Sequence, residues 1–160
     1  MKVWTSGHLL TERDFWERLQ KERQGKKVVF TNGCFDLLHV GHVRYLKEAR
    51  QLGDLLVVGL NSDASVQRLK GRERPLQKED ARGEILSSLF FVDYVLLFDE
   101  DTPFNLIKKI LPDVLVKGGD WEPSKIVGAD VVLAHGGEVR SLQFVEGYST
   151  THLWEQLKKL

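Results

Sequence analysis

Short apolar runs recur along the chain, and they alternate with longer blocks in which apolar residues stand three or four positions apart. The short runs are rich in Val, Leu and Phe and end in turn residues, a pattern typical of buried strands. The pattern predicts five strands, at 27–31, at 55–60, at 94–98, in "DVLVKGGDW" from residue 113, and in "EVRSLQF" from residue 138.

The longer blocks between these runs predict helices. Thr11 and Asp14 have the spacing of a helix N-cap pair, and Gly25 is a natural stop, so the first helix is expected over 11–24. The other expected helices are "GHVRYLKEARQLG" ending at Gly53, "ASVQRLKG", 78–91, "PFNLIKKIL" with Pro103 at its start, "VGADVVLAHGG" stopped by Gly136 or Gly137, and "STTHLWEQLKKL" with a hydroxyl cap.

Alternating strands and helices predict an α/β fold, a Rossmann-like, doubly wound parallel sheet of five strands with helices on both faces. We expect one domain over 1–160, with the N-terminal helix at 11–24 and a core at 26–160, because this length suits a single hydrophobic core. Ligands of such sheets bind outside the carboxyl ends of the strands. Five polar loops follow the predicted strands and are expected to form one site: "TNGCFD", "NSD", "FDED", "KGGDW" and "EGYSTT".

Composition narrows the function classes. With 42% apolar and 29% charged residues the chain is an ordinary globular protein, and its 23 basic and 23 acidic side chains balance. Balanced charge argues against nucleic acid or a membrane surface as the main partner, so an anion site must be a local cluster. No apolar run approaches the roughly 20 residues of a membrane span, and no signal peptide is recognisable. A cytoplasmic protein is expected, with its single cysteine, Cys34, reduced.

The stretch "TNGCFDLLHVGH" holds the densest candidate chemistry. His39 and His42 are three positions apart at the start of a predicted helix, and Gly41 between them leaves the backbone open to a ligand. The helix N-terminus adds N–H groups and a partial positive charge, which suit an anion. Zinc would need more ligands than the chain offers nearby. Cys34 as a nucleophile, Cys34 as a small packed thiol, and histidines that only cap and pack all remain open interpretations.

A family resemblance decides among them. "GCFDLLHVGHVRYL" after the first strand resembles the signature of the nucleotidyltransferase superfamily that carries His-x-Gly-His. The second signature of that superfamily, Ile-Ser-Thr-Thr, opens the last helix, and here it stands as "GYSTT" with Tyr148 in place of isoleucine. The resemblance covers about 26–160. Within the superfamily, the first motif together with "FDEDTP" and "KGGDW" is similar to the heptose 1-phosphate adenylyltransferases, and the chain is expected to be a free-standing form without the sugar kinase found in many relatives.

The resemblance implies a reaction and a set of roles. AMP would pass from ATP to a heptose 1-phosphate with release of pyrophosphate, and Mg²⁺ would be carried mainly by the ATP phosphates. Catalytic contacts to the phosphates are expected from His39, His42 and Lys70. Nucleotide binding is expected from Gly33, Cys34, Phe35, Gly41, Gly118, Asp120, Trp121, Ser149, Thr150 and Thr151, and acceptor binding from Asp36, Asn61, Arg74 and Arg82. No residue is firmly assigned to a metal, and a homodimer is expected on the same ground.

Several of these residues have plainer alternatives. The basic run around Lys70, Arg72 and Arg74 could be a solvated turn, and the hydroxyls of "STT" could only cap the last helix. Trp121 could be a core aromatic, and Asp36 could fix its loop by accepting backbone N–H bonds.

The chain also departs from one branch of the superfamily. Where glycerol-3-phosphate cytidylyltransferases carry two arginines, this chain has Phe90 and Phe144. The departure argues against that branch, although a cytidylyltransferase for another phosphorylated polyol and a non-catalytic nucleotide-binding module remain the alternatives.

Overall fold

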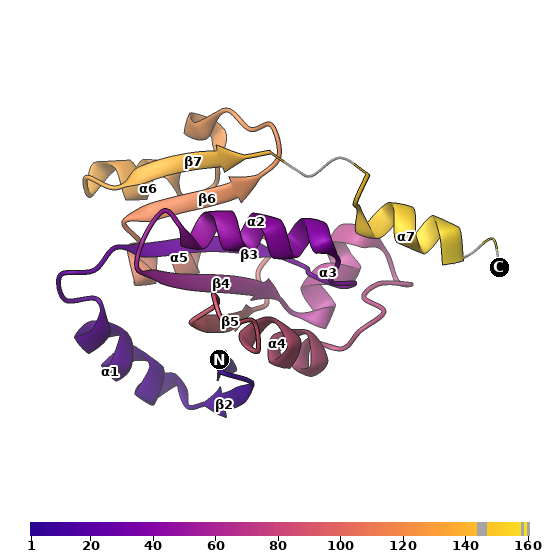
Figure 1. The fold of residues 1–160 in the computed structure, drawn as a ribbon, viewed down its shortest axis with the longest axis horizontal. Coiled ribbons are helices and arrows are strands. Elements are labelled where there is room, and N and C mark those ends of the chain that lie inside the picture. Colours follow the sequence, from indigo (N-terminus) through magenta and orange to yellow (C-terminus); the bar gives the residue numbers. More distant parts are fainter. Residues whose placement is uncertain (144–146, 158, 160) are drawn as a thin grey trace.

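A single mixed sheet carries the fold. The computed structural model describes residues 1–143, 147–157 and 159, with the side chains of 151, 152 and 157 left out of the description. Seven strands are found in this part of the chain: β1 (Val3–Thr5), β2 (His8–Leu10), β3 (Val28–Gly33), β4 (Leu55–Asn61), β5 (Tyr94–Phe98), β6 (Val114–Gly118) and β7 (Glu138–Leu142). Their order across the sheet is β2-β1-β5-β4-β3-β6-β7 (Figure 1).

Strands β3 to β7 form the parallel sheet that the alternation predicted. From β3 the chain runs outward to β4 and β5, then returns to β6 on the other side of β3. The order therefore reverses between β3 and β6, which is the switch point where doubly wound sheets bind ligands.

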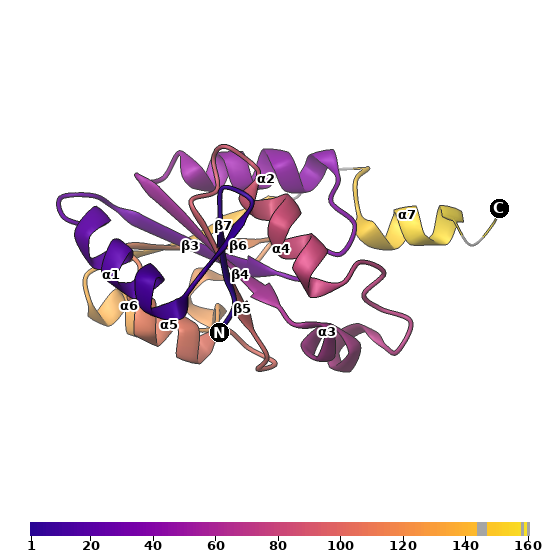
Figure 2. The ribbon, with the colours of Figure 1, turned by 90° about the horizontal axis from the view of Figure 1, so that it is seen from below.

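Helices cover both faces of the sheet, as predicted. Their bounds are α1 (Glu12–Glu22), α2 (Val40–Arg50), α3 (Asp63–Lys70), α4 (Glu79–Ser87), α5 (Phe104–Ile110), α6 (Ala129–Ala134) and α7 (Thr150–Leu157), with a 3₁₀ turn, η1, at Pro123–Lys125. Figure 2 shows α2 and α4 on one face and α1, α5 and α6 on the other, whereas α7 lies beyond the sheet. Each face has its own apolar layer, with Leu46 and Leu86 on the first and Phe15, Ile107 and Val132 on the second.

The count of five strands was wrong, because the pattern missed the N-terminal hairpin. β1 and β2 pair antiparallel, and β1 also pairs antiparallel with β5 through Val3 and Leu96. Ser6 and Gly7 connect them with φ of 48° and 76°, the positive values that a two-residue hairpin turn needs. Strands of three residues are too short to display a period of two, so the hydrophobic pattern gave no signal for them.

Helix ends differ from the predictions by a few residues. The helix predicted at 78–91 ends at Ser87, because the backbone N–H of Ser88 closes its last turn. The following residues Phe91 and Val92 are buried in the core. The segment "VGADVVLAHGG" does form a short helix, α6, followed by Gly136 at a φ of 78°. Among the described residues, no helix is long and apolar enough to cross a membrane.

Candidate active site

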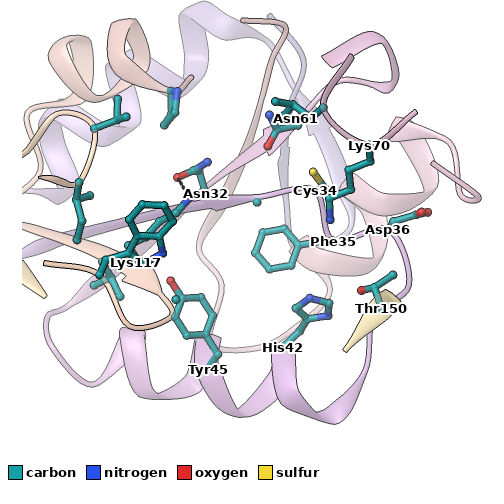
Figure 3. Close-up of a pocket in the computed structure, with 18 of the residues that line it drawn as sticks. Asn32, Cys34, Phe35, Asp36, His42, Tyr45, Asn61, Lys70, Lys117 and Thr150 are labelled. Atoms are coloured by element: carbon teal, nitrogen blue, oxygen red, sulfur yellow. Dashed lines mark hydrogen bonds between the residues drawn. The ribbon is translucent and has the colours of Figure 1, made fainter. Parts of the chain in front are cut away.

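A cavity of about 610 Å³ opens at the carboxyl edge of the sheet, at the switch point. All five predicted loops contribute to its wall: Asn32 to Asp36 at the end of β3, Asn61 at the end of β4, Asp101 after β5, Lys117, Gly118 and Trp121 at and after the end of β6, and Tyr148 to Thr150 at the start of α7. Figure 3 shows side chains from these segments converging on one space. The carboxyl ends of parallel strands therefore meet in a single site, as the alternation of elements predicted.

Most residues predicted for the site do line this cavity, and three do not. The lining includes Gly33, Cys34, Phe35, Asp36, His39, Gly41, His42, Asn61, Lys70, Gly118, Trp121, Ser149 and Thr150. Arg74, Arg82 and Asp120 lie outside the lining, and the side chain of Thr151 is outside the described residues. The roles of the lining residues toward a ligand stay predictions.

The first turn of α2 brings the two histidines face to face. The rings of His39 and His42 stack with centroids 3.8 Å apart, and the backbone N–H of His39 donates to Nδ1 of His42 over 3.4 Å. Nδ1 of His39 is buried and has no hydrogen-bond partner among the described residues. This nitrogen lies against the backbone of Gly41, whereas both histidine residues line the cavity.

Gly41 makes this stacked arrangement possible. A Cβ at position 41 would lie 2.9 Å from two atoms of the His39 ring and 3.1 Å from Cβ of Tyr148. Any other residue would therefore displace the histidine or the segment leading to α7. The N–H groups of the first turn of α2 have no partner within the helix, and they carry the positive end of its dipole. The "HVGH" stretch thus places two imidazoles and free N–H groups at one helix end, an arrangement suited to an anion.

Burial sets the charge of the histidines. The pKa of His42 is lowered to about 4, chiefly by desolvation and in smaller part by the charges of His39 and Lys70, while a backbone hydrogen bond at Leu37 raises it. Desolvation also lowers the pKa of His39. Both rings are therefore neutral near pH 7 without a ligand, and an anion placed beside them would favour the protonated form.

Asp36 and two arginines connect the segments around the cavity. Nε of Arg74 lies 2.5 Å from Oδ2 of Asp36, and Oδ1 of Asp36 accepts from the backbone N–H groups of Leu76 and Gln77. The loop-fixing alternative for Asp36 is thus what the structure contains. Asp36 also lines the cavity, and its predicted contact with an acceptor stays a prediction.

The second arginine, Arg82, is only 1% exposed, and its donors are used internally. They reach the carbonyl oxygens of Gln77, Cys34 and Asn61 and the carboxylate of Asp63 at 2.6–3.0 Å. Arg82 therefore ties the ends of β3 and β4 to α3 and α4. Acceptor binding had been predicted for Arg74 and Arg82, but neither lines the cavity, and both donate hydrogen bonds to groups within the protein.

The remaining predicted residues occupy the rim. Trp121 is 50% exposed, so the alternative of a core aromatic is wrong. Cys34 is half-buried, and the neighbouring Phe35 packs edge-on against the ring of His42. Phe90, which stands where the related branch has an arginine, is exposed and outside the cavity lining, and Phe144 lies outside the described residues.

Lys117 was not predicted, although it lines the cavity. It is half-buried near the end of β6, its Nζ lies 3.5 Å from Oδ1 of Asn32, and burial lowers its pKa. A signal was present in the sequence: a lysine interrupts an otherwise apolar run just before two glycines, at the carboxyl end of a predicted strand. Such a position points a charge at the ligand edge of the sheet.

No group of three or more His, Cys, Asp or Glu side chains in the described part of the chain could hold a metal ion. The two carboxylates of the lining, Asp36 and Asp101, are each paired with an arginine. This donor set fits a Mg²⁺ ion that arrives coordinated by nucleotide phosphates and water rather than one held by protein ligands.

A Rossmann-like sheet with a helix N-terminus and two stacked histidines at its switch point is typical of nucleotide-binding proteins of the α/β class. Comparison with protein families makes this specific: the Cytidylyltransferase-like family matches residues 30–156, and the chain belongs to this family of nucleotidyltransferases.

Individual relatives agree with this assignment. The chain is 58% identical over 151 residues to "Bifunctional protein HldE" of Campylobacter concisus, covering 94% of this chain and 31% of that protein. It is 59% identical over 137 residues to the protein of that name from Syntrophotalea carbinolica, covering 86% and 28%. The chain thus spans less than a third of the length of these relatives. Among solved structures, the lipopolysaccharide core biosynthesis protein from Thermoplasma volcanium is similar, with a TM-score of 0.61, 32% identity and coverage of 78% of this chain and 100% of that one.

Proposed function

We propose that the chain transfers AMP from ATP to a heptose 1-phosphate, giving ADP-heptose and pyrophosphate. The observation that carries the proposal is the stacked pair of His39 and His42 at the start of α2, because both histidines line a cavity that Lys70 also lines. The heptose rests on the motif resemblance, on relatives named HldE, and on a similar structure titled for lipopolysaccharide core biosynthesis.

The proposed reaction requires the protein to position the two substrates and to neutralise their negative charge. An oxygen of the sugar phosphate attacks the α-phosphorus of ATP, the bond from that phosphorus to the bridging oxygen breaks, and the electron pair leaves with pyrophosphate. The nucleophile is already an anion, because the second pKa of a phosphate monoester is about 6, so no general base is required. Two repelling anions must be brought together and the charge of the leaving group absorbed.

The residues of the cavity suit these tasks. His39, His42 and the N–H groups of the first turn of α2 would hold the ATP phosphates, and Lys70 would offset charge on the β- and γ-phosphates. Ser149 and Thr150, at the start of α7, offer hydroxyls on the same wall. Mg²⁺, when bound with the nucleotide, would neutralise part of the phosphate charge. A cytoplasmic location and a homodimer remain predictions.

Pyrophosphate release tests this proposal. The purified chain would be assayed with ATP or CTP in turn, each with heptose 1-phosphate or glycerol 3-phosphate, in buffer containing Mg²⁺. We expect turnover with ATP and heptose 1-phosphate, and at least about tenfold lower kcat/KM for the other three pairs. Preference for CTP or for glycerol 3-phosphate would refute the assigned substrates.

The second candidate is a cytidylyltransferase for another phosphorylated polyol, and the description of the matching family favours it. A third possibility, a non-catalytic nucleotide-binding module, predicts nucleotide binding without pyrophosphate release for any of the four substrate pairs. The same assay, combined with a binding titration of ATP, separates all three.

A further inference from the structure

The charged side chains around the cavity are unevenly paired. Asp36 and Asp101 each contact an arginine, and Lys125 lies 2.7 Å from a carboxylate oxygen of Glu122. Two other lysines of the lining, Lys70 and Lys117, form no ion pair with the described residues. The cavity therefore carries two cationic groups whose charge the surrounding protein does not balance.

Lys117 is the more unusual of the two, because it is half-buried. Its nearest polar partner is the side-chain oxygen of Asn32, at a long 3.5 Å, and no carboxylate compensates its charge within the described chain. An ammonium removed from water without a counter-ion destabilises the fold, whereas an apolar side chain at this position would extend the layer formed by Leu115. The position is therefore explained by an anion that enters the cavity.

The two lysines lie at different sides of the space. Figure 3 shows Lys117 and Asn32 at one side, and Lys70 and Thr150 at the other. In an in-line displacement the attacking oxygen and the leaving oxygen stand on opposite sides of the α-phosphorus. If Lys70 offsets the charge of the leaving pyrophosphate, the attacking phosphate needs a cation on the opposite side.

We propose that Lys117, together with Asn32, binds the attacking phosphate of the acceptor, so that the cavity has an acceptor subsite at the ends of β3 and β6 and a pyrophosphate subsite at Lys70. This inference rests on the proposed function and adds to it the residues that hold the second substrate. The ammonium of Lys117 attracts the phosphate monoester dianion, and the amide of Asn32 donates to one of its oxygens. No proton transfer is needed, because the phosphate reacts as an anion.

Steady-state kinetics of Lys117→Met tests the acceptor subsite. We expect the KM for heptose 1-phosphate to rise at least ~10-fold, the usual loss for one charge-assisted contact, while the KM for ATP changes less than about twofold. Lys117→Arg should recover part of the acceptor affinity. The control is Lys27→Met, which removes an exposed lysine beside the other end of β3 and should leave both constants unchanged. Equal effects of Lys117→Met on the two KM values, or no effect on either, would overturn the proposal.

A binding measurement separates this inference from the proposed function. The α,β-methylene analogue of ATP occupies the nucleotide site without reacting, and calorimetry then measures the binding of heptose 1-phosphate, and separately of inorganic phosphate, to this complex. Lys117→Met should weaken both acceptor-site ligands at least ~10-fold without weakening the analogue. Such a result would support the subsite even if the wild type released no pyrophosphate from ATP and heptose 1-phosphate. Unchanged binding of both ligands would refute it even if that reaction were confirmed.

Discussion

Arg74 and Asp36, 38 positions apart in the chain, form a buried ion pair with Nε and Oδ2 2.5 Å apart, and both side chains are less than 10% exposed. The same carboxylate accepts two backbone N–H groups of the loop that follows Arg74. One aspartate after β3 thereby holds the loop between α3 and α4, next to the helix end that carries Lys70. The buried charges of Asp36 and Arg74 therefore hold this loop in place.

Replacing Asp36 should therefore destabilise the protein strongly. Asp36→Ala leaves the Arg74 guanidinium buried without a counter-ion, which typically costs about 3–5 kcal/mol. Urea denaturation measures the loss. Asp101→Ala is the matched control, since Asp101 also lines the cavity but forms an exposed pair with Arg68, and it should cost less than about 1 kcal/mol. Similar losses for the two variants would contradict the bracing role of Asp36.

Removing the second histidine should impair the reaction more than the fold. His42→Ala should lower kcat at least ~100-fold, because a lost contact to transition-state charge typically costs about 3 kcal/mol. Pyrophosphate release gives the rate, and a thermal melt checks the fold. Unchanged turnover together with a lower Tm would mean that His42 only packs against His39 and Phe35.

Stability should fall between pH 6.5 and pH 4, in part through His42. Above pH 6.5 the ring is neutral in both the folded and the unfolded chain. Below that pH the unfolded chain binds a proton that the folded protein resists, since burial lowers the folded pKa to about 4. The lost stability is at most about 2–3 kcal/mol at pH 4. Denaturation of wild type and His42→Gln at pH 7 and pH 5 measures it, and the variant should lose less on acidification. Equal losses of stability in the wild type and in His42→Gln would rule out His42 as a source of this pH dependence.

Lys70 should contribute to the reaction of ATP through its phosphates and should contribute little to the binding of the nucleoside. Lys70→Ala should lower kcat/KM for ATP by at least ~10-fold while adenosine binding is kept, because one charge-assisted contact to the leaving group is removed. Arg72, two positions further along in the loop after α3, is the matched control. It is exposed and outside the cavity lining, so Arg72→Ala should change the rate less than about threefold. A near wild-type kcat/KM in Lys70→Ala would remove this residue from the site.

The thiol of Cys34 should be dispensable. Cys34→Ser should keep at least about a tenth of the activity, because an in-line displacement by a phosphate oxygen needs no covalent intermediate. Mass spectrometry of the wild type with ATP gives a second check. A nucleotide covalently attached to Cys34, or complete loss of turnover with ATP binding intact, would restore the nucleophile interpretation.

The order of elements in the parallel core could be predicted from the sequence because each element carries its own periodic pattern. The apolar run before Thr31 becomes β3, and the helix predicted at 11–24 forms as Glu12–Glu22 with Thr11 as its cap. Parallel strands place their carboxyl ends at one edge, so the five polar loops could be assigned to one site without coordinates. Local spacing likewise placed His39, Gly41 and His42 in one helical turn.

Only the tertiary structure decided which charges face the cavity and which support it. Arg74 and Arg82 resemble phosphate ligands in the sequence. Their partners, however, include Asp36 for Arg74 and, for Arg82, carbonyl oxygens 21 and 48 positions away, which no local pattern reveals. Lys117 was overlooked because its environment depends on the pairing of β6 beside β3, a contact between residues far apart in the chain. The hairpin of β1 and β2 was missed for a related reason, since its three-residue strands are held by pairing with β5 rather than by a pattern of their own. Local sequence thus determined the elements and the edge where they meet, whereas long-range pairing and burial determined the role of each charged side chain.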